Sequence, residues 1–291
     1  MHIATPHHIT KKTRESGMLN KKKMERASSP GSNPVEVREC IEEMLKQTLE
    51  SHLKGSLEID IGLSKQFCST LLQNHSVSHP TDSLGVTISP LYYKRLASAL
   101  YESIISGPSC GSSNNTSLFN KDNDSKQKDE LNELILDKGS ELASILKSIN
   151  FELHVQEPYF TQLKDGVKTV EGRCAVGDYK CIRSGALILI NKWLVLEVQE
   201  VHHYDSFLEM LEAESLTKVL PGVKTMEEGV QVYRKFYTEQ KEKSNGVLGI
   251  RVVKSAVQPY ICLGIILSCL SYRGIQNLLG LGHLQLPHNL T

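Results

Sequence analysis

The sequence predicts an α+β protein, with a small helical region followed by a small β-barrel that has flanking helices. Up to residue 149, apolar side chains recur at three- and four-residue steps, as they do on amphipathic helices. From residue 150 to 256 the period shortens to two, and strand-like segments alternate with short helical ones. Residues 107 to 129 are polar and rich in Ser and Asn, so we expect a linker there.

The first 33 residues are expected to form a disordered basic arm. They carry seven Lys and Arg residues against two Glu residues, interleaved with Ser, Pro, Gly and Asn. Such a segment is either a solvated tail or an arm for nuclear import or RNA contact.

Helices are expected over residues 34 to 106 and 130 to 149. The first follows Pro34 and stops at Gly55, and a shorter helix follows Ser64. A third helix has Ser89 as its N-cap and ends before Gly107. The expected apolar stripes comprise Val37, Ile41, Met44, Leu45, Leu49, Leu53, Phe67, Leu71, Leu72, Tyr93, Leu96, Leu100, Ile104, Leu131, Leu134, Ile135, Leu142, Ile145, Leu146 and Ile149.

Residues 150 to 256 are expected to form the barrel. FELHV and KTVEGR are predicted strands, and the helical segment between them closes at Gly166. ALILINKWLVLEVQEV predicts two strands joined near Asn191, and GVLGIRVV predicts the last strand. Two helices lie between, each with the S/T-x-x-E spacing of a capping box, at Ser206 and at Thr225; the second is expected to end at Gly246. The spacing of Tyr233, Phe236 and Tyr237 on this second helix predicts that they belong to the core. Short helices without a βαβ rhythm favour a mixed or antiparallel sheet that curls on itself.

Residues 257 to 291 are expected to contain an apolar helix. The stretch from Pro259 to Leu270 is the most apolar in the chain, but its twelve residues fall short of the roughly 20 needed to span a bilayer. We therefore expect a helix that is buried or faces a protein partner, and no membrane partner.

The charge and the cysteines restrict the function. Lys plus Arg and Asp plus Glu are balanced at 33 each, so a nucleic-acid site would have to be a local patch. The seven cysteines form no CxxC pair, which favours a reduced nuclear or cytoplasmic setting. His202 and His203 lack a third ligand at metal spacing, so we expect neither a metal nor a cofactor.

Three charges stand together in GVKTVEGR, at residues 166 to 173. In a strand, Glu171 and Arg173 share a face, and Lys168 joins them if the turn at Gly166 redirects it. Glu214 falls on the apolar side of the helix that follows Ser206, so it needs a partner. Lys168 or Arg173 is the expected partner, which would place Glu214 in the same cleft.

The stretch LHVQEPYFTQLKDGVKTVEGR resembles the start of an ASCH domain. The resemblance depends on the pattern G-x-K-x-x-E-x-R, formed here by Gly166, Lys168, Glu171 and Arg173. The segments SFLEMLEAESLTKVLPG, EEGVQVYRKFY and GVLGIRVV extend it over residues 150 to 256. It implies a PUA-like β-barrel with a cleft beside the motif and RNA binding. The helical region and the tail look like those of plant members.

We therefore expect the chain to bind RNA or a modified nucleotide, in RNA processing or transcription coactivation. Lys168 and Arg173 would engage phosphate or a base, while Glu171 and Glu214 would orient them or accept from an exocyclic amine. Stacking could come from Tyr159, and also from Phe160, Trp193 or Tyr204, although such aromatic side chains are more often part of a core.

Three alternatives remain open. A bacterial branch of the resembled family deacylates modified cytidine with a Lys, a Thr and a Glu, and the matching positions are Lys168, Glu171 and Glu214. An amidohydrolase for acylated nucleosides is therefore possible, although Glu171 replaces the Thr hydroxyl. The four charges could instead form a structural ion network. The chain could also be an adaptor that binds proteins through its terminal helices.

Overall fold

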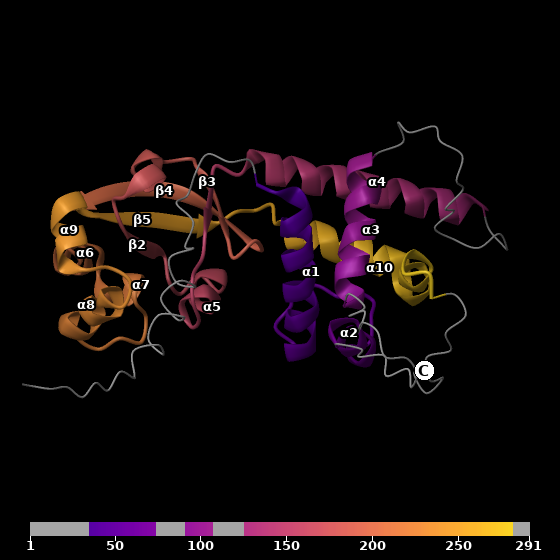
Figure 1. Cartoon of the computed structure of the whole chain (residues 1–291), viewed down its shortest axis with the longest axis horizontal. Coiled ribbons are helices and arrows are strands. Elements are labelled where there is room, and N and C mark those ends of the chain that lie inside the picture. Colours follow the sequence, from indigo (N-terminus) through magenta and orange to yellow (C-terminus); the bar gives the residue numbers. More distant parts are fainter. Residues whose placement is uncertain (1–34, 74–90, 107–124, 282–291) are drawn as a thin grey trace, which may run out of the picture.

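The structure is a computed structural model that describes residues 35–73, 91–106 and 125–281 (Figure 1). The expected basic arm, most of the expected linker and the N-cap expected at Ser89 lie outside these residues. Figure 1 shows the sheet with helices α5 to α9 in one half of the molecule, and helices α1 to α4 with α10 in the other.

The helical half begins with α1 (Val37–Lys54) and α2 (Lys65–Leu72). Gly55 ends α1 with a φ of 70°, and the Ser64 hydroxyl caps α2 by accepting from the Phe67 amide. These two predicted boundaries are confirmed. Helices α3 (Tyr92–Ser106) and α4 (Ser125–Ser148) follow, and α4 therefore includes the last residues of the expected linker.

Within the described residues, five strands form one mixed sheet in the order β1-β3-β4-β5-β2. They are β1 (Phe151–Leu153), β2 (Val170–Cys174), β3 (Leu187–Ile190), β4 (Leu194–Tyr204) and β5 (Val247–Lys254). Only β1 and β3 pair in parallel, and β2 is an edge strand. Asn191 and Lys192 both have positive φ, as a tight turn between two antiparallel strands requires. The predicted α+β fold with a curled mixed sheet is confirmed.

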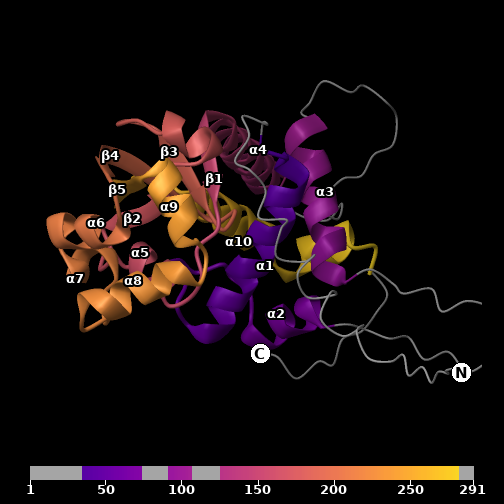
Figure 2. The ribbon, with the colours of Figure 1, turned by 60° about the vertical axis from the view of Figure 1, so that its left-hand side comes forward.

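Short helices lie around the edge strand β2. They are α5 (Tyr159–Lys164), η2 (Gly177–Cys181), α6 (Phe207–Glu214), α7 (Leu216–Val219), α8 (Met226–Arg234) and α9 (Glu239–Asn245) (Figure 2). Both predicted caps are present, at Ser206 and Thr225. The single helix predicted from Thr225 to Gly246 was wrong, because α8 ends at Arg234 and Thr238 caps a new helix.

The sheet and the helical half share one hydrophobic core. Trp193 stacks on Tyr260 with ring centroids 3.8 Å apart, and its indole N–H donates to the Thr48 hydroxyl on α1. The turn after β3 is also held by α1, since Lys192 pairs with Glu39 at 2.6 Å. Because Trp193 is 1% exposed, it belongs to this core and offers no stacking surface. A smaller cluster lies under α6 and α8, around Phe207 and Tyr233.

Helix α10 (Pro259–Leu278) is longer than the predicted apolar helix. Its length and composition would suffice to cross a membrane, but 44% of its most apolar window is buried inside the chain. The buried side includes Tyr260, Leu263, Ile266 and Leu267. Ser271, with a φ of 55°, kinks the helix near its middle. The apolar side of α10 therefore packs into the chain's own core.

Candidate functional site

The three charges of the GVKTVEGR motif meet around one carboxylate. Glu171 Oε2 lies 3.1 Å from Lys168 Nζ, and Glu171 Oε1 lies 2.9 Å from Arg173 Nε. The turn at Gly166, with a φ of 72°, lets Lys168 reach the strand that follows. Burial raises the pKa of Glu171, but the two cations outweigh it and hold the pKa below its ordinary value, so the carboxylate is ionised.

Lys168 is a structural member of this group. Its side chain is buried, and its ammonium donates to the Val170 carbonyl at 2.6 Å and to the Val219 carbonyl as well as pairing with Glu171. An ammonium has three N–H donors, and these three acceptors occupy them all. Lys168 therefore ties α7 to β2 and fixes Glu171.

Arg173 lies at the more exposed edge of this group of charges. Its Nη2 donates to the His154 carbonyl at 2.9 Å, and its side chain also bonds Tyr237. Burial opposes its charge, yet Glu171 holds the pKa of Arg173 above its ordinary value. The side chain is 16% exposed.

Four tyrosines surround the Glu171–Arg173 pair. Tyr159 and Tyr233 interact electrostatically with Glu171, and Tyr179 and Tyr237 with Arg173. We call this group the Arg173 cluster; its members are Lys168, Glu171, Arg173, Tyr159, Tyr179, Tyr233 and Tyr237. The structure thus brings together the four residues expected to bind nucleic acid. Sequence reasoning missed Tyr179. The core prediction for Tyr233 is confirmed, since this residue is 6% exposed and stacks on Phe207, but no spacing links Tyr233 or Tyr237 to the motif.

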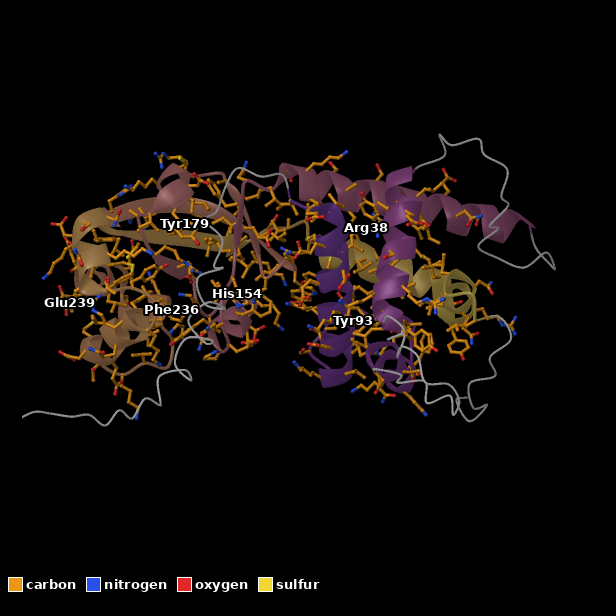
Figure 3. The ribbon with its side chains drawn as sticks, viewed as in Figure 1. Arg38, Tyr93, His154, Tyr179, Phe236 and Glu239 are labelled. Atoms are coloured by element: carbon orange, nitrogen blue, oxygen red, sulfur yellow. The ribbon has the colours of Figure 1, made fainter. Side chains whose placement is uncertain are left out.

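Two exposed aromatic residues adjoin the cluster, one along the chain and one through its backbone. Phe236, next to Tyr237, is 49% exposed, and His154 is exposed beside Arg173. Figure 3 labels His154, Tyr179 and Phe236, which come from three separate segments of the sheet half. The prediction that Phe236 belongs to the core was wrong, since α8 ends before it.

Glu214 belongs to a different network. Its Oε1 accepts from His202 Nδ1 at 2.7 Å and from Tyr204 Oη at 2.8 Å, and its Oε2 accepts from Arg251 Nε at 2.8 Å. Burial raises the pKa of Glu214, but these bonds hold it below its ordinary value. The expected pairing of Glu214 with Lys168 or Arg173 was therefore wrong.

Strand alternation explains this separation. Gly172 pairs with Gly249, and a Cβ atom built on Gly249 would lie 3.3 Å from Glu214 Cγ. Glu214 therefore lies over the face of the sheet to which Gly172 and Gly249 belong. Glu171 and Arg173 alternate with Gly172, so they point to the opposite face.

A β-bulge builds the second network. Val198 pairs with Val252 and Glu200 pairs with Arg251, so Gln199 is an extra residue in β4. The bulge reverses the alternation and turns Glu200, His202 and Tyr204 toward Glu214. Sequence reasoning missed Arg251, because only the register of β4 and β5 brings it there.

No metal site accompanies either network. In the part of the chain that the structure describes, no group of three His, Cys, Asp or Glu side chains could hold a metal ion.

The curled sheet with its short flanking helices defines a PUA-like α+β domain. Residues 153–255 match the family model of the ASCH domain. The chain belongs to the ASCH-domain family, as its motif indicated, and at family level this domain is associated with RNA binding. The likeness of the helical region to plant members stays a prediction.

Two solved structures are similar to this region. A crystal structure of the hypothetical protein PH0355 is 42% identical over 36% of this chain and 97% of that chain, with a TM-score of 0.35. A solution NMR structure of protein PF0455 from Pyrococcus furiosus is 41% identical over 36% of this chain and 97% of that chain, with a TM-score of 0.33. No curated protein matches the chain.

Proposed function

We propose that the chain binds single-stranded RNA or a modified nucleotide at the Arg173 cluster. The observation that carries this proposal is a guanidinium held by a buried carboxylate and surrounded by tyrosines. Single-stranded RNA is recognised by stacking on aromatic side chains and by hydrogen bonds to base edges. The cluster combines both kinds of group.

Arg173 is the member that contacts the ligand. Its Nη2 donates to the His154 carbonyl, and its Nε lies 2.9 Å from Glu171 Oε1 without forming a hydrogen bond, so N–H groups remain for the acceptors of a base or a phosphate. Tyr179, Tyr237 and the exposed Phe236 supply stacking surfaces beside it. Lys168 and Glu171 hold Arg173 in place.

The same geometry favours binding over hydrolysis. The hydrolytic alternative needs Lys168, Glu171 and Glu214 to act on one substrate. The Lys168 ammonium is occupied by three acceptors, and Glu214 lies on the other face of the sheet. A binding role requires neither group to reach the ligand.

The experiment is a titration of the full chain with a short fluorescent single-stranded RNA at several salt concentrations. Arg173→Lys keeps the charge but removes the planar fork, and should weaken binding about tenfold. Phe236→Ala removes an exposed ring and should also cost about tenfold. The control is the same substitution in the helical half, Arg38→Lys on α1 (Figure 3). Arg38 is exposed, and its Nη2 lies 3.4 Å from Glu102 Oε1.

The proposal fails if wild type shows no salt-dependent RNA binding, or if Arg173→Lys and Phe236→Ala both bind as tightly as Arg38→Lys. Thermal melting of each variant separates a binding loss from unfolding. Phe236→Ala is the safer variant in this respect, because its ring is half exposed.

A further inference from the structure

A surface pocket of about 310 Å³ lies beside Arg251, between helix α7 and the strands β2, β4 and β5. Its lining comes from the start of β2, the bulge of β4, helix α7 and β5, and comprises Thr169, Val170, Gln199, Glu200, Lys218, Arg251 and Val252. Ligand pockets in proteins commonly begin near this size. The RNA site proposed above uses none of these side chains.

Arg251 is the most constrained side chain of this pocket. Its Nε bonds Glu214 at 2.8 Å and its Nη1 bonds Glu200 at 2.6 Å, while 43% of the side chain stays exposed. Two carboxylates offset its charge, so it is poorly suited to hold a phosphate. They also lock the guanidinium plane, and a planar guanidinium is a surface on which a nucleobase stacks.

The backbone around Arg251 is specialised in three ways. The bulge at Gln199 aims Glu200 at Arg251, and Gly249 leaves room for Glu214. Ser215, directly after Glu214, has a φ of 75°, a conformation that costs free energy for a residue other than glycine. Bulges and strained residues concentrate at functional sites, so their presence around Arg251 indicates that its fixed position serves a function.

The rest of the lining suits a nucleotide. Thr169 and Gln199 offer hydrogen bonds to a base edge. Lys218 is exposed and makes no ion pair with any residue that the structure describes, so its ammonium can meet a phosphate. We propose that this pocket binds a single nucleotide, with its base on Arg251 and its phosphate on Lys218. This inference goes beyond the proposed RNA site and does not require it.

The test is calorimetric titration of the full chain with the four common nucleoside 5′-monophosphates and their nucleosides. Lys218→Ala should weaken the best monophosphate about tenfold and leave its nucleoside unchanged. Arg251→Lys, which keeps the charge but removes the plane, should weaken both about tenfold. Lys224→Ala is the matched control, because Lys224 is also exposed but lies outside the pocket lining.

Arg173→Lys distinguishes this site from the proposed RNA site. It should weaken RNA binding and leave monophosphate binding intact. The inference is overturned if none of the four monophosphates binds saturably, or if their binding is unchanged in either Lys218→Ala or Arg251→Lys. It is also overturned if Arg173→Lys is the variant that abolishes monophosphate binding. Failure of RNA binding alone would count only against the Arg173 cluster.

Discussion

Replacing Glu171 by Gln is expected to destabilise the fold by about 3 kcal/mol. The carboxylate is 8% exposed and lies within 3.1 Å of Lys168 and 2.9 Å of Arg173. Removing one partner of a buried ion pair costs about 3–5 kcal/mol, because a buried charge is left without compensation. The lower end applies here, since Lys168 keeps two carbonyl acceptors and Gln keeps one oxygen.

Urea unfolding of the full chain at neutral pH measures this loss. The chain has one tryptophan, Trp193, and its burial against Tyr260 makes its fluorescence a reporter of the native core. The matched control is Glu212→Gln, an exposed position on α6, where the change should stay within about 0.5 kcal/mol. If Glu171→Gln loses less than about 1 kcal/mol, this carboxylate does not hold the buried cations, and the cluster is assembled differently.

Three further outcomes are expected from urea unfolding of the same chain. Glu171 and Glu214 lie on opposite faces of β2 and β5 and share no partner. The stability losses caused by Glu171→Gln and by Glu214→Gln should therefore add within about 0.5 kcal/mol in the double variant. A larger deviation from additivity would contradict two separate networks. Both carboxyls have a folded pKa below the ordinary 4.5, so their contribution to the free energy of unfolding is fully present above pH 4.5 and is lost as the pH falls through the lowered values. Glu171→Gln should therefore flatten the dependence of the unfolding free energy on acid pH. An unchanged pH dependence in this variant would contradict the lowered pKa of Glu171. In Gly172→Ala the new methyl would lie 2.4 Å from Tyr233 Oη, which should lower the free energy of unfolding by about 1–3 kcal/mol. Part of this stability should return in the double variant Gly172→Ala/Tyr233→Phe, which lacks the hydroxyl. If Gly172→Ala is as stable as the wild type, Tyr233 does not pack against Gly172.

Local sequence signals predicted most elements of the fold. The Gly55 stop and the Ser64, Ser206 and Thr225 caps each depend on contacts within a few residues, and all four are present. The convergence of Lys168, Glu171 and Arg173 was predictable for the same reason, because one turn and one strand determine it. The family motif covers this same stretch.

The errors arose where distant contacts decide the outcome. The partner of Glu214 depends on the register of β4 against β5 and on the bulge at Gln199, neither of which has a signature in one sequence. Tyr179 reaches Arg173 only because the chain after β2 turns back through η2. Phe236 was placed in the core because an apolar stripe seemed to continue past Arg234, whereas Thr238 starts a new helix.

Photocrosslinking locates the RNA on the protein and so tests whether it contacts the Arg173 cluster. A single-stranded oligonucleotide containing 4-thiouridine is crosslinked to the full chain, and the modified peptides are identified by mass spectrometry. We expect crosslinks at Tyr179 or at Phe236 and Tyr237, and we expect them to be lost in Arg173→Lys. Crosslinks confined to the basic segment 1–33 or to the helical half would contradict it.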